Sequence, residues 1–264
     1  MPEGVPEGQR LEGKVALVTG ASRGIGEAIS RRFAQEGARV ALAARSEDSC
    51  RRIAREIEAS GGGAIAIAAD VTDAPAIARM ISAVVEKWGR IDVLVNNAGL
   101  GGPTPLSDRD DSSWDAILAT NLTAVFRVTR EALPHLSDGA RIINLSSVVG
   151  RFGVAGLGAY SATKHGVIGL TRTFALELAP RGITVNAMCP GWVETGMSQE
   201  GFRRIVAHAG GTEEEGRRIA AKMAPLGRII ETEEVAGLAA YLASEDARSI
   251  TGQAIVLDGG QVMP

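Results

Sequence analysis

Tyr160 and Lys164 are the most chemically informative pair in the sequence, because they lie four residues apart and Ser147 lies thirteen residues upstream of the tyrosine. On a helix, residues at this spacing share a face, with Cβ atoms roughly 5–6 Å apart. A phenol titrates at about pH 10, so it is a poor acid at neutrality unless a cation favours its phenolate form. We therefore expect the Lys164 ammonium to lower the pKa of Tyr160. Taken alone, such a pair also fits an ordinary solvent-exposed helix.

A glycine-rich turn near the N-terminus indicates a phosphate site. The apolar run 15–18 is followed by Thr19-Gly20-Ala21-Ser22-Arg23-Gly24-Ile25-Gly26 and then by apolar residues at helical spacing. A buried strand, a tight turn and a helix present backbone N–H groups to a phosphate, and the glycines allow its close approach. The spacing is Gly-x-x-x-Gly-x-Gly, which differs from the usual Gly-x-Gly-x-x-Gly dinucleotide fingerprint. Its position between strand and helix favours nucleotide binding over a purely structural turn.

Further motifs continue this series along the chain. They are, in order, Asn96-Asn97-Ala98-Gly99, Asn121, Ser147, Tyr160, Lys164 and Pro190-Gly191. With the glycine-rich turn, they closely resemble the short-chain dehydrogenase/reductase family over residues 14–260, without departure at a catalytic position. The overall texture is most similar to 3-oxoacyl-carrier-protein reductases and polyketide ketoreductases. This resemblance implies an enzyme that interconverts a ketone and a secondary alcohol by hydride transfer with a nicotinamide cofactor.

The resemblance also implies a role for each catalytic position. Tyr160 would act as general acid on the developing alkoxide, and Ser147 would hydrogen-bond the same oxygen. Lys164 would bind the nicotinamide-ribose hydroxyls and tune Tyr160. Asn121 would hold a water that links Lys164 to solvent. The neighbouring Ser146 lacks the family spacing to Tyr160, so a structural role is open for it.

Cofactor contacts follow from the same resemblance. Val193 and Thr195 would face the nicotinamide carboxamide, Asp70 would contact the adenine ring, and segment 96–99 would line the adenosine ribose and stabilise the sheet. Trp192 is equally a pocket wall or a core residue. The complete set of expected cofactor contacts is Gly20, Ser22, Arg23, Gly24, Ile25, Gly26, Arg45, Ser46, Asp70, Val71, Asn97, Ala98, Gly99, Tyr160, Lys164, Pro190, Gly191, Val193 and Thr195.

The end of the second expected strand bears on the choice of cofactor. This strand runs into Ala44-Arg45-Ser46. An acidic residue at this point would bond the adenosine ribose hydroxyls and repel a 2′-phosphate. Ala44 removes that repulsion, and both Arg45 and Arg23 could pair with the phosphate. We therefore expect NADP(H) to be preferred over NAD(H); the alternative is that both arginines are ordinary surface residues.

Apolar runs alternate with amphipathic stretches, which predicts βαβ units and a single doubly wound, Rossmann-like α/β domain with a seven-stranded parallel sheet. Helices should cover both faces, and the ligand should lie beyond the carboxyl ends of the strands. The expected strands are 14–19, 39–43, 64–69, 91–95, 140–146, 182–188 and 254–257. The expected helices are 24–36, 47–60, 74–88, 111–136, 158–179 and 232–243.

The domain boundaries follow from the segments outside this alternation. Residues 1–13 are polar, lack the apolar region of a signal peptide and are expected to form a flexible tail. The catalytic domain would then span 14–264. Within it, residues 195–225 interrupt the alternation, and we expect a substrate lid there in preference to a simple surface excursion.

Composition fits a compact cytoplasmic enzyme. The chain has 264 residues, 45% of them hydrophobic, and a net charge of −3, which gives no electrostatic footprint for nucleic acid or an anionic membrane. No stretch approaches the roughly eighteen apolar residues of a transmembrane helix. Cys50 and Cys189 have neither metal-type spacing nor a disulfide framework, and the three histidines are scattered, so no metal is expected.

Substrate and assembly are less constrained by the sequence. A 3-oxoacyl thioester is the leading substrate; the alternative is an NAD(H)-dependent dehydrogenase of a small alcohol, sugar, hydroxybutyrate or steroid. A non-catalytic nucleotide sensor is a remote third possibility, because both Tyr160 and Lys164 are present.

The sequence also indicates an interface between subunits. Apolar residues lie beyond one core-facing stripe in the helices 111–136 and 158–179, and also in 254–257. By resemblance we expect a homotetramer with 222 symmetry, with a dimer as the alternative.

Overall fold

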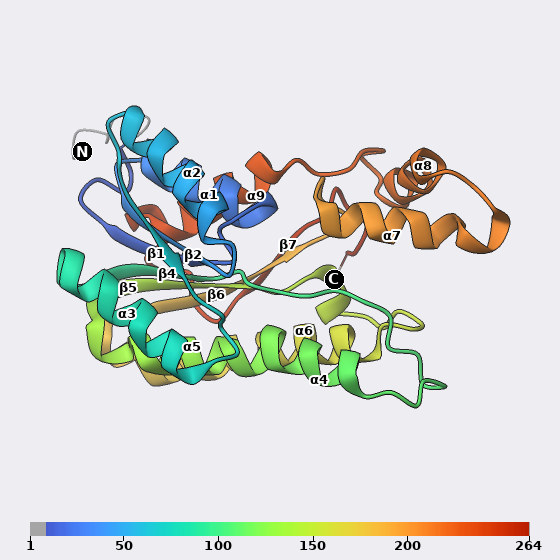
Figure 1. Ribbon diagram of the computed structural model, residues 1–264, viewed down its shortest axis with the longest axis horizontal. Helices are drawn as coiled ribbons and strands as arrows, with labels where there is room; N and C mark the ends of the chain where they lie inside the picture. Colours follow the sequence, from blue (N-terminus) through green and yellow to red (C-terminus); the bar gives the residue numbers. More distant parts are fainter. Residues whose placement is uncertain (1–8, 264) are drawn as a thin grey trace.

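A seven-stranded parallel sheet is the centre of the fold, as the alternation of elements predicts (Figure 1). The computed structural model describes residues 9–263. The strands lie in the order β3-β2-β1-β4-β5-β6-β7. This order reverses between β1 and β4, so the carboxyl ends of these two strands flank the position at which such sheets bind ligands. The strands are β1 (Val15–Thr19), β2 (Arg39–Ala44), β3 (Gly63–Ala68), β4 (Ile91–Asn96), β5 (Leu136–Leu145), β6 (Thr184–Pro190) and β7 (Ala254–Leu257).

Helices cover both faces of this sheet and bury two apolar cores. Successive side chains of β1 alternate between them: Ala16 and Val18 point into the first core, Val15 and Leu17 into the second. Burial on both faces explains why the strand is an uninterrupted apolar run. The first face carries α1 (Gly24–Gln35), α2 (Glu47–Ala59) and α9 (Thr232–Ala243), and the second carries α3 (Ala74–Trp88), α5 (Ala124–Ala132) and α6 (Gly158–Leu178) (Figure 1).

The continuous helix expected over 111–136 is divided in the structure. α4 (Ser112–Leu118) passes through a π-helical turn, Ala119–Thr123, into α5. A 3-10 turn containing Pro134 then ends the helix, and β5 begins four residues earlier than expected, at Leu136. Proline has no N–H to continue the helical bonds, which accounts for the stop. The π turn carries Asn121, and such turns often lie at functional sites.

Residues 195–225 form a helical hairpin that the sequence pattern does not reveal. It consists of α7 (Gly196–Val206) and α8 (Glu213–Met223). The helices cross closely at Gly216, where a Cβ would lie only 2.0 Å from the carbonyl oxygen of Phe202. They enclose a small apolar cluster built on Phe202, Ala220 and Ile229, separate from the two main cores.

The described part of the expected N-terminal tail is packed against the domain. Leu11 is fully buried, and its N–H donates to the carbonyl oxygen of Glu36 at 2.8 Å. The Arg10 guanidinium pairs with the Glu36 carboxylate at 3.1 Å. A single apolar residue among polar neighbours gives no periodic signal, so sequence alone does not separate 9–13 from 1–8. Residues 1–8 lie outside the described part of the chain.

Two classes of feature are not found between residues 9 and 263. No helix in that range is long and apolar enough to cross a lipid bilayer. Nor does the described chain bring together three or more His, Cys, Asp or Glu side chains that could hold a metal ion.

Candidate active site

Ser147, Tyr160 and Lys164 come together beyond the carboxyl end of β5. Ser147 starts a 3-10 turn after that strand, and its hydroxyl accepts the N–H of Val149 at 3.2 Å. Tyr160 and Lys164 lie in the first two turns of α6. The Lys164 Nζ is buried and stands 5.5 Å from the centroid of the Tyr160 ring. The structure thus places a phenol, an amine and a hydroxyl side by side at the edge where the sheet binds ligands.

The pKa of Tyr160 moves in the opposite direction from that expected. Burial raises the pKa of the Tyr160 phenol, and interaction with the Ser147 hydroxyl only partly opposes that rise. Burial also lowers the pKa of Lys164 to about 8. The Lys164 Nζ donates a hydrogen bond to the carbonyl oxygen of Leu145, at 2.7 Å. The four-residue spacing predicts how close the two groups lie, but it does not predict how much water each of them loses.

Ser146 anchors the backbone of Lys164. Its buried hydroxyl donates to the carbonyl oxygen of Lys164 at 2.9 Å. The turn passes so close to α6 that a Cβ on Gly150 would lie 2.6 Å from Ser146 Oγ and 2.7 Å from the Lys164 carbonyl oxygen. Ser146 is therefore the structural member of the serine pair, and Ser147 is the one that interacts with the Tyr160 hydroxyl.

Asn121 holds the segment that follows β4. Its Oδ1 accepts the N–H of Leu100 at 2.7 Å, and its Nδ2 donates to the carbonyl oxygen of Leu100 at 2.8 Å. A Cβ on Gly99 would lie 3.4 Å from Asn121 Oδ1 and 3.8 Å from Lys164 Nζ. Asn121 is therefore close to Lys164, but its amide is committed to the backbone of Leu100. A water relay through Asn121 stays a prediction.

The glycine-rich turn leaves no room for a side chain at Gly20 or Gly26. A Cβ on Gly26 would lie 2.3 Å from the carbonyl oxygen of Gly20 and 2.5 Å from Asn97 Nδ2. Gly20 itself has φ +66°, a conformation that favours glycine. Asn97 Nδ2 donates to the carbonyl oxygens of Thr19 at 2.9 Å and Gly20 at 3.1 Å. Segment 96–99 thus braces the turn from the neighbouring strand.

The N-terminus of α1 lies at the end of this turn. Its N-cap residue, Arg23, makes no side-chain hydrogen bond to the helix. The N–H groups of the first turn are therefore not capped by that side chain. A helix N-terminus with such groups attracts phosphate. A Cβ on Gly24 would lie 3.3 Å from Thr195 Cγ2, so the loop after β6 meets the turn here.

Arg23 and Arg45 are exposed, and neither forms an ion pair with another residue in the range 9–263. Arg45 follows β2 and acts electrostatically on Asp70 at the end of the neighbouring strand. Hydrogen bonds from Thr72 are the main cause that lowers the pKa of Asp70, and the positive charge of Arg45 adds to it. Both guanidinium groups are thus available to an anion at this edge.

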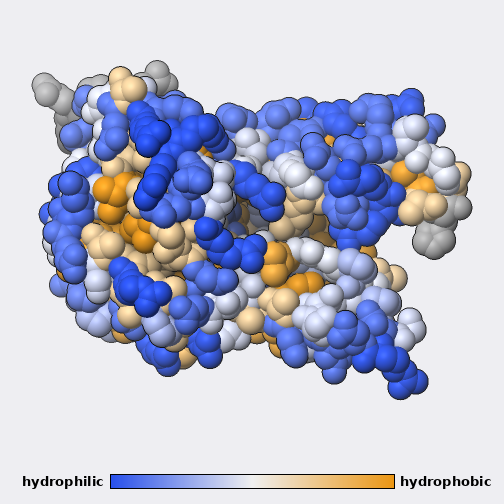
Figure 2. Space-filling view, in the orientation of Figure 1, coloured by the Kyte–Doolittle hydropathy of each residue, from blue (hydrophilic) through white to orange (hydrophobic). Residues whose placement is uncertain are grey.

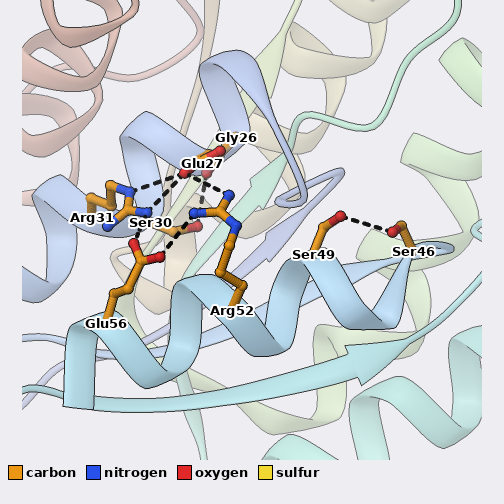
Figure 3. A network of polar contacts seen from close by, with 8 residues as sticks. All are labelled: Gly26, Glu27, Ser30, Arg31, Ser46, Ser49, Arg52 and Glu56. Carbon is orange, nitrogen blue, oxygen red and sulfur yellow. Dashed lines mark hydrogen bonds and ion pairs between the residues drawn. The ribbon is translucent and has the colours of Figure 1, made fainter. Parts of the chain in front are cut away.

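Ion pairs fix α2 against α1 in the same region (Figure 3). The Glu27 carboxylate accepts from Arg31 at 2.9 Å and from Arg52 at 3.2 Å, and Glu56 pairs with both arginines. At the start of α2, the hydroxyls of Ser46 and Ser49 lie 2.9 Å apart. This network joins the helix that follows the glycine turn to the helix that follows Arg45.

The loop after β6 links the site to the α7–α8 hairpin. Gly191 donates its N–H to Leu257 at 3.0 Å, and Thr195 caps α7 by accepting the N–H of Ser198. Trp192 packs on Phe202, with ring centroids 5.3 Å apart. A Cβ on Gly201 would lie 2.5 Å from the Trp192 ring. Of the two roles left open for Trp192, the structure gives it the core role, within the hairpin cluster.

A hollow runs between this hairpin and the lobe that carries α4 (Figure 2). Met197 belongs to α7 on the hairpin side, and residues 100–103 belong to the chain between β4 and α4 on the other side. A Cβ on Gly101 would lie 3.3 Å from Met197 Sδ, so the two sides approach closely at this point. Tyr160 and Lys164 lie on α6, which packs against α4 and against the 3-10 turn that follows Ser147.

A buried polar network lies behind the site, and the sequence motifs do not include it. Asn96 Nδ2 donates to Thr129 at 3.0 Å and to Asn144 at 2.9 Å, and Asn144 donates to Thr171 at 2.9 Å. The network ties β4 and β5 to α5 and α6. Polar residues inside otherwise apolar runs, at Asn96 and Asn144, are the signal that could have indicated it.

Comparison with known proteins gives a consistent result. A family described as enoyl-(acyl carrier protein) reductase matches residues 20–261. A 3-oxoacyl-acyl-carrier-protein reductase of Thermotoga maritima is 42% identical over 256 residues, which cover 96% of this chain and 100% of that protein. A ketoacyl reductase named for the monensin polyketide synthase, from Streptomyces virginiae, is 47% identical over 254 residues, covering 94% and 96% of the two chains.

The solved structures agree. The crystal structure of an actinorhodin polyketide ketoreductase variant with NADPH superposes with a TM-score of 0.90 at 42% identity, covering 94% of this chain and 97% of that one. A short-chain dehydrogenase/reductase from Serratia marcescens gives a TM-score of 0.87 at 38% identity, with 96% and 99% covered.

Proposed function

This chain belongs to the short-chain dehydrogenase/reductase family, and from that membership we propose that it is an NADP(H)-dependent ketoreductase acting on the 3-oxo group of an acyl or polyketide chain held as a thioester. The observation that carries the proposal is the convergence of Ser147, Tyr160 and Lys164, with Lys164 close to Gly99 in the segment that braces the glycine-rich turn. The names of the ketoacyl and 3-oxoacyl reductases that it resembles support the substrate class.

The residues of the turn fit a dinucleotide. Gly20 and Gly26 are packed so closely that a Cβ at either would collide with the backbone or with Asn97, and this leaves a bare main-chain surface at the N-terminus of α1. The cofactor, when bound, supplies or takes up the hydride. Gly20–Gly26 would hold its pyrophosphate, segment 96–99 and Lys164 its riboses, and Pro190–Thr195 its nicotinamide.

Arg23 and Arg45 favour NADP(H). Both are exposed without an ion-pair partner among the described residues, and Ala44 presents no carboxylate to repel a 2′-phosphate. A guanidinium makes strong, charge-assisted bonds to phosphate oxygens. The NADPH in the structure of the actinorhodin ketoreductase, which shares 42% identity, supports the same choice.

Tyr160 is the proton donor in this proposal. As the carbonyl carbon gains a hydride, its oxygen becomes an alkoxide, and the Tyr160 hydroxyl gives it a proton. The raised pKa keeps this phenol protonated at neutral pH but makes it a weaker acid, so the proposed transfer needs the Lys164 ammonium, 5.5 Å from the ring centroid, to stabilise the phenolate that is left. Ser147 donates a second hydrogen bond to the same oxygen and stabilises its developing charge.

Lys164 links the proposed ribose site of the cofactor to the proton donor, Tyr160. Its pKa of about 8 leaves it mostly protonated at neutral pH, so it can donate to ribose hydroxyls and return a proton towards Tyr160. Asn121, fixed on the π turn, keeps segment 99–100 against Lys164. We further propose that the α7–α8 hairpin acts as the substrate lid, and that the enzyme works in the cytoplasm.

Initial-rate measurements test the proposed ketoreductase function. The protein is assayed with NADPH and NADH against an acetoacetyl thioester, a bicyclic ketone, a simple secondary alcohol in the reverse direction, and a crotonyl thioester. We expect NADPH-dependent reduction of the acetoacetyl thioester and no reduction of the crotonyl double bond. Activity only on the small alcohol with NAD⁺ would replace the proposal with the alternative dehydrogenase, and reduction of the crotonyl thioester would indicate an enoyl reductase.

A further inference from the structure

Thr104 is the anchor of an otherwise exposed loop. Among residues 103–110, Thr104 alone is partly buried, and Leu106 is fully exposed. The Thr104 N–H donates to the carbonyl oxygen of Gly156 at 2.7 Å, and Thr104 forms an isolated parallel bridge with Leu157. The loop that follows the candidate nucleotide site is therefore tied to the chain just before α6.

The Thr104 side chain completes the N-terminus of α6. The N-cap of this helix is Leu157, whose side chain has no acceptor. Thr104, 55 residues away in sequence, supplies one: its Oγ1 accepts the N–H of Ala159 at 2.9 Å. Ala159 is fully buried, so its N–H has no water to replace this bond. Ala159 directly precedes Tyr160.

The same residue fixes one side of the substrate hollow. The chain from Leu100 to Thr104 is held at two points, at Leu100 by Asn121 and at Thr104 by the start of α6. Between them, Gly101 faces Met197 of the hairpin. At the other end, a Cβ on Gly158 would lie 3.2 Å from the Thr104 carbonyl oxygen, so the contact is close.

We propose that Thr104 is a positioning residue, which locks the substrate-facing segment 101–103 to the helix turn that carries Tyr160 and so fixes the proton donor relative to the bound ketone. This inference rests on the proposed ketoreductase function. Thr104 itself contacts neither reacting group. It acts through Ala159 and through the segment 101–103.

Thr104→Val tests the inference, because valine keeps the shape of threonine and removes the acceptor. We expect kcat/KM for the acetoacetyl thioester to fall about tenfold, with a rise in KM, while the dissociation constant of NADPH changes less than twofold. Thr104→Ser keeps the acceptor and should restore kcat/KM to within threefold of the native enzyme. Thr232→Val is the matched control, because the Thr232 hydroxyl bonds to the exposed carboxylate of the adjacent Glu233, at 3.0 Å.

Hydrogen exchange of the protein without ligands gives a readout independent of activity. In Thr104→Val, amides in the peptide 158–161 should exchange faster, and the core strands should be unchanged. Native kcat/KM and native exchange in that variant would overturn the proposal, as would a Thr104→Ser enzyme as impaired as Thr104→Val. If the native protein reduces no ketone, the proposed function fails, but the exchange experiment still decides whether Thr104 caps the helix.

Discussion

Lys164 Nζ donates a 2.7 Å hydrogen bond to the main-chain carbonyl of Leu145, the last residue of β5. The bond brings a buried amine to the end of the central sheet, beneath the candidate nucleotide site. Because the Lys164 pKa is lowered from 10.5 to about 8 by burial, the charge of this amine changes within an accessible pH range. This relationship gives the first prediction.

NADPH affinity should fall above about pH 8, where the free enzyme loses the Lys164 ammonium. Cofactor fluorescence measured between pH 7 and 9.5 should show a dissociation constant that is flat below pH 8 and rises by up to about tenfold per pH unit above it. Lys164→Met should bind NADPH more weakly at every pH and lack this rise. An unchanged rise in that variant would assign the titration to another group.

The lowered pKa of Lys164 also predicts how stability depends on pH. Stability should rise with pH, whereas NADPH affinity should fall. The folded-state pKa lies below the unfolded value of 10.5, so the folded protein disfavours the charged amine. The contribution of Lys164 to the free energy of unfolding should therefore increase as pH rises from about 8 to 10.5, and Lys164→Met should remove that increase. Urea titrations of both proteins across this range measure it.

Tyr160→Phe should lower the rate of ketone reduction more than a hundredfold, because it removes the proton donor and leaves the ring. The dissociation constant of NADPH and the melting temperature should be nearly native. Ser147→Ala should cost somewhat less, since Ser147 only stabilises the developing charge. Near-native turnover by Tyr160→Phe would contradict the assignment of the acid.

Arg45→Ala should raise the KM for NADPH about ten- to a hundredfold and leave the KM for NADH nearly unchanged, because a bond between charged groups is worth roughly 1.5–3 kcal/mol. Adding Ala44→Asp should repel the phosphate and turn the preference towards NADH. Arg51→Ala is a suitable control, because Arg51 is paired with Glu47 on the exposed face of α2. Equal losses with both cofactors would show that Arg45 is structural.

A homotetramer is the expected assembly, with a dimer as the alternative. Leu176 on α6 is 79% exposed, and Phe126 on α5 is half-exposed and packs its ring 6.2 Å from Phe174. Leu176→Asp should reduce the mass measured by light scattering at micromolar concentration. Leu226→Asp, at a leucine after the hairpin that is 66% exposed, should not change the mass. A native protein of monomeric mass would refute the prediction.

The sequence predicts the fold well because burial on both faces gives most strands a short apolar run. Val15–Thr19 is one such run, and the sheet that it starts is confirmed. The division of 111–136 is less visible, because a single π turn has no residue types of its own by which the sequence could reveal it. The α7–α8 hairpin escaped prediction because its apolar face is narrow and closes mainly on itself.

The sequence predicts the parts of the site that belong to one motif. It predicts less well the contacts between residues that are far apart in the chain. The gathering of Ser147, Tyr160 and Lys164 follows from one strand end and one helix. The commitment of the Asn121 amide to Leu100 and the cap that Thr104 gives to α6 depend on contacts across 21 and 55 residues. The pKa directions of Tyr160 and Lys164 depend on burial, which no spacing of residues specifies.

The hairpin cluster has a further consequence, for how the protein can change over evolution. Along 192–193, Trp192 points into the hairpin and Val193 into the main core; along 229–230, Ile229 and Ile230 divide in the same way. The two segments are bridged at Val193 and Ile230, so one short ladder separates the two packing units. Residues 196–223 therefore pack largely apart from the main core, whereas 224–226 contact Gly259 and Gly260. A change in the length of the segment 196–223 would leave the packing of the sheet and of α6 in place.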